Sequence, residues 1–235
     1  MNLLYAASEA APFIKSGGLG DVSGALPSEL SRHIDTEISV VLPYYREIKN
    51  NHNHEIEYVT SFYMPLSWRN SYVGIFKTTV KEKPIPGKKP SVVTYYFIDN
   101  EHYFDRDDIY GYPDDGERFA YFSKAVLEMM CKLSLVPDII HCNDWQTGFI
   151  PLFLKSFYHN IFPDVRTVFT IHNIEYQGKA DPDFLGEVLG LGEEWRNVCT
   201  HNKLINAMKT AIVLSDKITT VSDTYANEIK YEYFA

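Results

Sequence analysis

The order of apolar and polar segments at the N-terminus constrains the fold more than any other feature of the sequence. Residues 3–7 and 38–43 are short apolar runs that suit buried strands. Between them lies a glycine-rich loop, followed by apolar side chains at helical spacing over residues 21–33. We expect a helix there that Pro27 kinks or interrupts, because proline lacks the N–H of the helical hydrogen bond. A strand–helix–strand unit of this kind predicts a parallel sheet.

The same alternation returns in the second half of the chain. Helices are expected at residues 117–133, 145–158 and 203–214, and strands at 138–142, 166–172 and 217–221. The region between the two halves differs, because its extended segments follow one another without helices, which predicts a local antiparallel insertion. We therefore predict an α/β fold: one doubly wound, Rossmann-like domain over residues 1–235, with a β-rich insertion at about 52–100.

Composition excludes several classes of function. The chain has 22 Lys and Arg against 31 Asp and Glu, which gives a net charge of −9. A nucleic-acid binder needs a surplus of basic residues, so we expect no nucleic-acid partner. No apolar stretch approaches the roughly 20 residues of a membrane helix, and we expect a cytoplasmic protein without a membrane partner. The three cysteines are scattered, and no set of residues has metal-ligand spacing, so no metal site is expected.

Polar side chains follow the predicted parallel strands at the point where each strand ends. They are Lys15 in the glycine loop, Asp144 after strand 138–142, and His172 with Asn173 at the end of strand 166–172. In doubly wound sheets, ligands bind outside the carboxyl ends of the strands. The sequence therefore predicts an active site at this edge of the sheet.

The glycine loop, Lys15–Asp21, matches neither of the two familiar phosphate-binding patterns. The GxGxxG dinucleotide fingerprint is absent, and the lysine precedes the glycines instead of following them as in a P-loop. What remains is a lysine and bare backbone amides at the start of a helix, which suits an anion. The alternative is a flexible glycine turn beside a solvated lysine.

Asp144 and His172 each have a structural and a functional interpretation. Asp144 can be the N-cap of the following helix, and one of its oxygens can still meet a ligand. His172 can be a core histidine bonded to a backbone carbonyl, although His141 fits that description better. The charged loop at residues 105–108 is expected to be a solvated turn. No GxSxG nucleophile motif is present.

The residues around the glycine loop resemble one family closely. Ser8-Glu9, Lys15-Ser16-Gly17-Gly18-Leu19-Gly20-Asp21-Val22 and Gly24–Pro27 resemble the amino-terminal signature of bacterial glycogen synthases and plant starch synthases, K-T/V-G-G-L-x-D-V-x-x-x-L-P. The resemblance continues in order at Val41–Pro43, Phe97–Asp99, Tyr103–Arg106, Tyr110-Gly111, Glu117–Phe119, Pro137–Trp145, Phe169–Gly178 and Thr219–Ala226.

The resemblance implies an activity and a larger architecture. Members of the family transfer glucose from ADP-glucose to the non-reducing end of an α-1,4-glucan such as glycogen, with retention and without a metal or other cofactor. They use two Rossmann-like domains in a GT-B arrangement with the site in the cleft between them. This chain has about half the family length, so we expect it to be the N-terminal domain, inactive without the absent C-terminal nucleotide-binding domain.

The resemblance also implies roles for residues. Lys15 is expected to hold the donor's phosphates or glucose, and Gly17 and Gly18 to offer amides to the departing phosphate. The other implied positions, for donor or acceptor binding and catalysis, are Asp21, Tyr110, Asp144 and His172, with Asn173 adding hydrogen bonds. The expected catalytic set is His172, Asp144 and Lys15. The sequence departs from the family at Ser16, Asn143 and Gln146, the last two replacing histidines of the H-x-H-D-W-H version.

Two other functions are compatible with this fold. One is a stand-alone glucan-binding module without catalysis, which the polar rim of Lys15, Asp144 and His172 disfavours. The other is a GT-B glucosyltransferase that uses a different nucleotide sugar, of the sucrose-phosphate or trehalose type. The signature at Lys15–Leu19 disfavours the second, but this half alone does not distinguish ADP-glucose from UDP-glucose.

Overall fold

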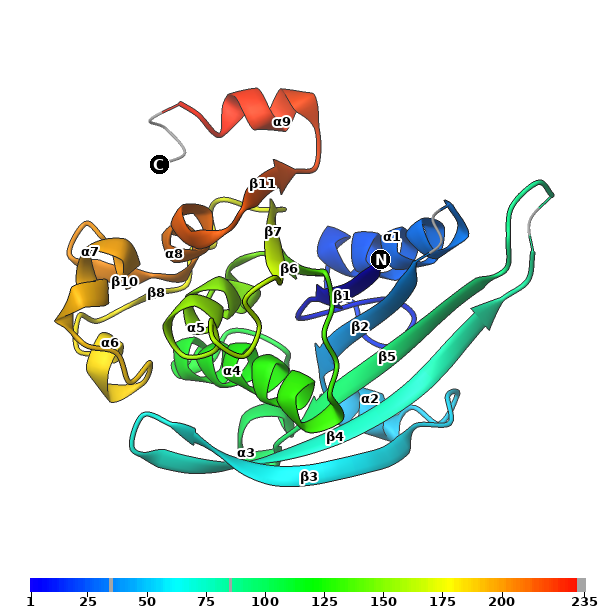
Figure 1. Ribbon diagram of the computed structural model, residues 1–235, viewed down its shortest axis with the longest axis horizontal. Coiled ribbons are helices and arrows are strands. Elements are labelled where there is room, and N and C mark those ends of the chain that lie inside the picture. The colour runs from blue at the N-terminus through cyan, green and yellow to red at the C-terminus, as the bar shows by residue number, and fades with distance from the viewer. Residues whose placement is uncertain (34–35, 85, 232–235) are drawn as a thin grey trace.

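An eight-stranded sheet runs through the whole molecule (Figure 1). The computed structural model describes residues 1–33, 36–84 and 86–231. Across the sheet the strands follow the order β11 (Lys217–Thr220), β7 (Arg166–Ile171), β6 (Ile139–Asn143), β1 (Asn2–Ala6), β2 (Glu37–Pro43), β5 (Ser91–Asp99), β4 (Arg69–Glu82) and β3 (Glu57–Leu66).

The parallel part of the sheet extends from β11 to β5, with β1 near its centre. From β1 the chain first builds outward through β2 to β5, and later outward on the other side through β6, β7 and β11. The direction of building reverses between β1 and β6, which creates a crevice at the carboxyl ends of those strands. The predicted doubly wound α/β fold is confirmed.

The segment between β2 and β5 forms a long hairpin. β3 pairs with β4, and β4 with β5, and both pairings are antiparallel, as the sequence predicts. β5 also pairs in parallel with β2 over Ile38–Pro43. The hairpin therefore continues the main sheet instead of forming a separate layer.

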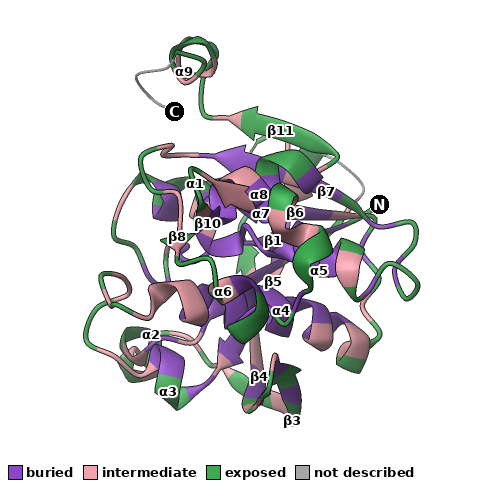
Figure 2. Cartoon of the chain, turned by 90° about the vertical axis from the view of Figure 1, so that its left-hand side faces the viewer, coloured by how far each residue is buried: buried purple, intermediate pink, exposed green. Residues whose placement is uncertain are grey.

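Helices cover both faces of the parallel strands (Figure 1). α1 (Gly18–His33) packs on β2 and β5, and α4 (Asp115–Leu133) covers the other side together with α5 (Ile150–Ser156). The buried residues concentrate on the central strands and α4, while β11 and the last helix are mostly exposed (Figure 2). The other helices are α2 (Arg46–Asn50), α3 (Glu101–Phe104), α6 (Phe184–Glu187), α7 (Arg196–Cys199), α8 (Ala207–Leu214) and α9 (Asp223–Glu228).

Helix α1 differs from its prediction in two ways. It begins at Gly18 instead of Asp21, and it continues through Pro27 as one α-helix. Pro27 is buried and the helix packs on two strands, so tertiary contacts outweigh the missing hydrogen bond. The early start places glycines in the first helical turn.

Two predicted helices are shorter than expected. The helix at 145–158 is a 3-10 turn over Trp145–Thr147 followed by α5, where Pro151 occupies the start of the helix that suits proline. The helix at 203–214 begins as β10 (Leu204–Asn206), which pairs with β8 (Lys179–Ala180) and β9 (Thr200–His201) in a small second sheet. Asn206 then caps α8 by accepting a hydrogen bond from Lys209 N–H at 2.8 Å. None of the helices in the described ranges is both long and apolar enough to cross a membrane.

Candidate active site

A cavity of about 740 Å³ opens at the carboxyl ends of β1, β6 and β7. The predicted site residues that line it are Gly17, Gly18, Tyr110, Asp144, His172 and Asn173. They come from loops that are far apart in the sequence and that the crevice between β1 and β6 brings together. The predicted position of the site at the carboxyl edge of the sheet agrees with this cavity.

Lys15 and Asp21 do not line the cavity. Lys15 Nζ forms an ion pair with Asp21 Oδ1 at 2.7 Å, and their side chains are 49% and 60% exposed. An exposed pair of this kind contributes less than about 1 kcal/mol to stability. The lysine therefore has a partner in the ligand-free chain, but a weak one.

Glu9 holds the glycine loop in place, and sequence reasoning did not single it out. Its buried carboxylate accepts hydrogen bonds from the backbone N–H of Ser16, from Ser16 Oγ at 3.1 Å and from Gly17 N–H at 3.3 Å. The Gly17 amide is thus already engaged, whereas the first N–H groups of a helix, here from Gly18 onward, lack intrahelical partners. The available signal was an acidic residue in the short segment between β1 and the glycine loop.

Tyr110 reaches the same carboxylate from the opposite wall. Its hydroxyl lies 2.6 Å from Ser8 Oγ and donates to Glu9 Oε1 at 3.2 Å. Burial raises the pKa of the Tyr110 phenol well above its ordinary value, so the hydroxyl stays protonated. Tyr110 and Glu9 therefore link the glycine loop to the loop that precedes α4.

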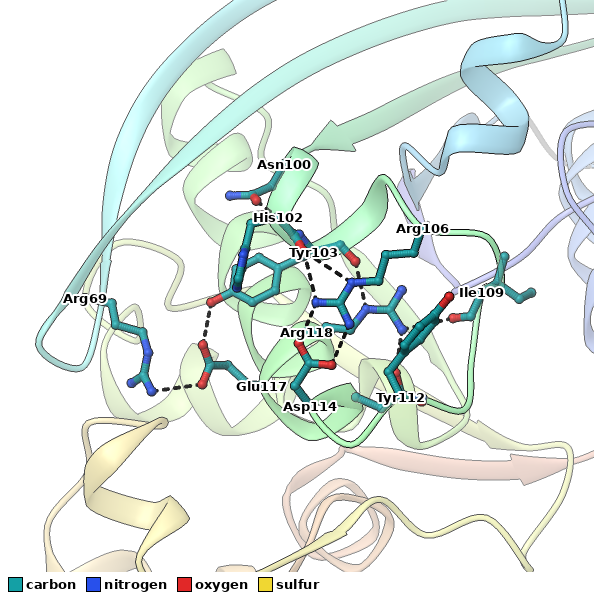
Figure 3. Close-up of polar contacts among 11 residues, drawn as sticks. Arg69, Asn100, His102, Tyr103, Arg106, Ile109, Tyr112, Asp114, Glu117 and Arg118 are labelled. Carbon is teal, nitrogen blue, oxygen red and sulfur yellow. Dashed lines mark hydrogen bonds and ion pairs between the residues drawn. The ribbon is translucent and has the colours of Figure 1, made fainter.

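The loop that carries Tyr110 is held by a network of arginines (Figure 3). Arg118 is fully buried and donates to the backbone carbonyls of Tyr103 at 2.8 Å and Ile109 at 3.3 Å. Arg106 binds Asp114 through two hydrogen bonds of 2.6 Å. Arg46 forms ion pairs with Asp105 and Asp107, while Asp107 and Asp108 stay exposed, so the turn at residues 105–108 is solvated as expected but also ion-paired. These contacts help to hold the loop that carries Tyr110.

Asp144 connects the end of β6 to the end of the neighbouring strand β7. Its Oδ1 accepts hydrogen bonds from the backbone N–H of His172 at 2.7 Å and of Asn173 at 3.2 Å. Asp144 occupies the N-cap position of the 3-10 turn, as one of its two interpretations predicted, but its side chain makes no capping hydrogen bond. Burial raises the pKa of the carboxyl to about 6, although the two backbone N–H groups act to lower it. The backbone at Asp144 has φ of 55°, a strained conformation of the sort that clusters at functional sites.

His172 lies against the cavity directly after β7. Its Nε2 is 2.9 Å from Asn143 Oδ1, and burial lowers the pKa of the imidazole to about 4. His172 is therefore neutral near pH 7. His141 is not among the cavity-lining residues. It lies 2.6 Å from Thr170 Oγ1, a side-chain hydroxyl in place of the expected backbone carbonyl, and burial lowers its pKa to about 4 as well.

Trp145 forms part of the cavity wall and is held by a glycine that no other residue could replace without strain. Gly178 has φ of +61°, and a Cβ added there would lie 2.2 Å from Trp145 Cε3. The Trp145 ring also packs edge-on against Phe119, with ring centroids 5.2 Å apart. Contacts with Gly178 and with Phe119 thus both hold the tryptophan.

The arrangement has two chemically different walls. One wall offers helix N–H groups that suit an anion. The other offers a buried carboxylate, a neutral imidazole and the Asn173 amide, which suit the hydroxyl groups of an uncharged ligand. Within residues 1–33, 36–84 and 86–231, no group of three or more His, Cys, Asp or Glu side chains could hold a metal ion.

Comparison with known proteins matches nearly the whole chain to one family. The family described as the starch synthase catalytic domain matches residues 2–235. The chain is 44% identical over 238 residues to the glycogen synthase of Ligilactobacillus salivarius, and 47% identical over 233 residues to that of Streptococcus mutans. These alignments cover 100% and 97% of the chain, but only 48% and 47% of the relatives.

A solved structure agrees with these sequence comparisons. The catalytic domain of Starch Synthase IV from Arabidopsis thaliana, solved bound to ADP and acarbose, superposes with a TM-score of 0.84 at 32% identity. It covers 98% of this chain, which spans 47% of that structure. The chain thus spans about half the length of the relatives it matches.

Proposed function

Because the chain belongs to the starch synthase catalytic domain family, we propose that it works as part of a glycogen synthase. The proposed reaction moves glucose from ADP-glucose to the non-reducing end of an α-1,4-glucan, with retention of configuration. In this proposal the chain supplies the half of the site that corresponds to the matched half of its relatives. The other half of the donor site comes from the part of the relatives that the chain does not span.

The observation that carries the proposal is the pairing of two unlike walls across one cavity. A nucleotide sugar has a charged diphosphate and an uncharged polyol, and the cavity offers groups for each. The start of α1, at Gly18, supplies N–H groups for phosphate, while Asp144 and His172 face the cavity from the opposite side. The Arabidopsis relative, solved with ADP and acarbose, supports both kinds of ligand.

Each site residue has a role in this proposal. Asp144 uses one oxygen to hold the His172 and Asn173 backbone, and its other oxygen accepts sugar hydroxyls. His172 contacts the transferred glucose. Lys15 exchanges its exposed partner Asp21 for the donor's phosphate, because a diphosphate offers more negative charge than one carboxylate. Helix N–H groups then stabilise the charge that develops on the departing phosphate.

A hybrid enzyme tests the proposal. Residues 1–235 replace the matched half of the Ligilactobacillus salivarius glycogen synthase, and transfer is measured from ADP-glucose to maltoheptaose. We expect transfer at a rate comparable to the parent enzyme, with products that an α-1,4-specific glucosidase degrades. The His172→Ala hybrid should lose on the order of 10² in kcat. Gly186→Ala is the matched control, since a Cβ there meets nothing within 4 Å.

Other outcomes support other functions. A folded hybrid that binds maltoheptaose but transfers no glucose would favour a glucan-binding module. A preference for UDP-glucose that the parent enzyme does not have would favour a different nucleotide-sugar transferase. The 235-residue chain on its own is expected to transfer no glucose, and measurable turnover by it would contradict the division of the donor site.

A further inference from the structure

A fully buried amide lies behind His172 and has all its hydrogen-bonding capacity in use. Asn143 Nδ2 donates to the backbone carbonyls of Ala6 at 3.0 Å and His141 at 3.2 Å. Asn143 Oδ1 lies 2.9 Å from Tyr5 Oη and 2.9 Å from His172 Nε2. An asparagine side chain has two N–H donors and two oxygen lone pairs, so these contacts saturate it.

The orientation of this amide follows from its partners. Two carbonyl oxygens can only accept, so the NH₂ group must face Ala6 and His141, and the opposite orientation would put oxygen against oxygen twice. Oδ1 therefore faces Tyr5 and His172, and it can only accept as well. Both of these partners must donate. Burial raises the pKa of Tyr5 to about 12, so its hydroxyl keeps the proton that it donates.

We propose that Asn143 is a positioning residue that fixes the His172 ring with its hydrogen on Nε2 and presents a bare Nδ1 at the cavity. Because the imidazole is neutral, a hydrogen on Nε2 leaves Nδ1 as an acceptor with no proton to give. No described residue donates a hydrogen bond to Nδ1. A ligand group that contacts His172 there must bring its own hydrogen, as a sugar hydroxyl does, and His172 cannot protonate it.

The chain of hydrogen bonds extends behind Asn143 to helix α1. Tyr5 Oη lies 3.4 Å from the buried Ser23 Oγ, so the order is Ser23, Tyr5, Asn143, His172. A histidine at position 143 could not make all four of these hydrogen bonds, because an imidazole has two ring nitrogens for four partners. Asn143, which stands where the H-x-H-D-W-H pattern has a histidine, makes all four.

The consequence of this tautomer for catalysis rests on the proposed function. The existence of the tautomer does not depend on that function. It is measured on the ligand-free 235-residue chain by two-bond ¹H–¹⁵N NMR of the histidine rings, with His172 assigned by the spectrum of His172→Gln. We expect a pyrrole-type Nε2 and a pyridine-type Nδ1. A hydrogen on Nδ1, or an even mixture of the two tautomers, would overturn the proposal whatever the hybrid enzyme does.

Two substitutions test whether Asn143 sets this state. In Asn143→Leu the acceptor is gone, and the pure Nε2–H form should give way to a mixture of the two tautomers; a retained pure Nε2–H form refutes the positioning role. Should the leucine variant fail to fold, Asn143→Ala removes the same acceptor with less bulk, and a pure Nε2–H form retained there also refutes the role. Thr170→Val is the control, because it alters the signals of His141 and leaves those of His172.

Discussion

Replacing Gly178 by alanine combines two separable penalties at the cavity wall. Its φ of +61° is a conformation that costs an L-residue about 1 kcal/mol. The added Cβ would also lie 2.2 Å from Trp145 Cε3 and 3.0 Å from Ala207 Cβ, so the tryptophan must move. Forcing extra volume into a packed site costs about 1–3 kcal/mol. The sum predicts a loss of about 3 kcal/mol for Gly178→Ala.

Other glycines of the chain isolate each penalty. Gly87 has φ of +80° and open space, so Gly87→Ala should lose about 1 kcal/mol from backbone strain alone. At Gly148 the positive φ is absent, but a Cβ would lie 2.6 Å from Ala207 O, so Gly148→Ala should lose about 2 kcal/mol from contact alone. Gly186 has neither feature, and Gly186→Ala should be neutral or stabilising by up to about 1 kcal/mol.

Urea unfolding followed by tryptophan fluorescence and circular dichroism measures these free energies. In thermal scans the Gly178→Ala loss should appear as a fall in Tm of about 9 °C, since 1 kcal/mol corresponds to about 2–4 °C in a chain of this size. The reasoning is refuted if Gly178→Ala lies within 1 kcal/mol of the wild type, or if it loses no more than Gly87→Ala.

The remaining predictions concern charged groups at the site. Asp144→Asn should raise the free energy of unfolding at pH 7 by about 3 kcal/mol, because the pKa of the wild-type carboxyl is raised to about 6 and its deprotonation in the folded protein is costly. The wild type therefore loses stability as the pH rises from about 4 through 6. Urea unfolding at a series of pH values should show the two proteins converging in stability below pH 4. Lys15→Ala should change the free energy of unfolding by less than about 1 kcal/mol, since its ion pair is exposed. The kcat of glucose transfer by the hybrid enzyme should fall. A change confined to the KM for maltoheptaose would contradict a role at the phosphates. Glu9→Gln should cost about 1–3 kcal/mol and speed hydrogen exchange at the Ser16 and Gly17 amides, and unchanged exchange there would show that Glu9 does not hold the loop.

The sheet was predictable because its strands carry local signals. Each parallel strand is a short apolar run that ends in a polar residue, so both the fold class and the edge that holds the site follow from neighbours in sequence. The failures occur where distant partners decide. The sequence pattern of β10 predicts the start of a helix, but the segment is a strand because it pairs with Lys179–Ala180. The residue types of Leu204–Asn206 and of their neighbours in sequence do not predict that pairing.

The site shows the same division between local and distant determinants. Asp144 follows a strand and precedes a helical turn, which locally resembles an N-cap. Its carboxylate turns instead to the backbone of His172 and Asn173, which the sheet brings within 3.2 Å. Glu9 escaped notice for a related reason. Its carboxylate accepts hydrogen bonds from backbone N–H groups of a loop. Every residue except proline has such a group, so the residue types of the loop do not indicate that Glu9 is their partner.

The central place of β1 also has a consequence for synthesis of the protein. β1 ends at Ala6, and the strand that covers its second edge begins only at Ile139. At about 5–20 residues per second, the ribosome needs on the order of ten seconds between the two. During that interval one edge of β1 can pair with β2, but the backbone N–H and C=O groups of its other edge have no strand partner until β6 is made. The Asn2 N–H likewise lacks the Asp138 carboxylate that accepts its hydrogen bond. The central pairing of the sheet therefore forms only after β6 has been synthesised, and until then β1 is the segment that a chaperone would have to shield.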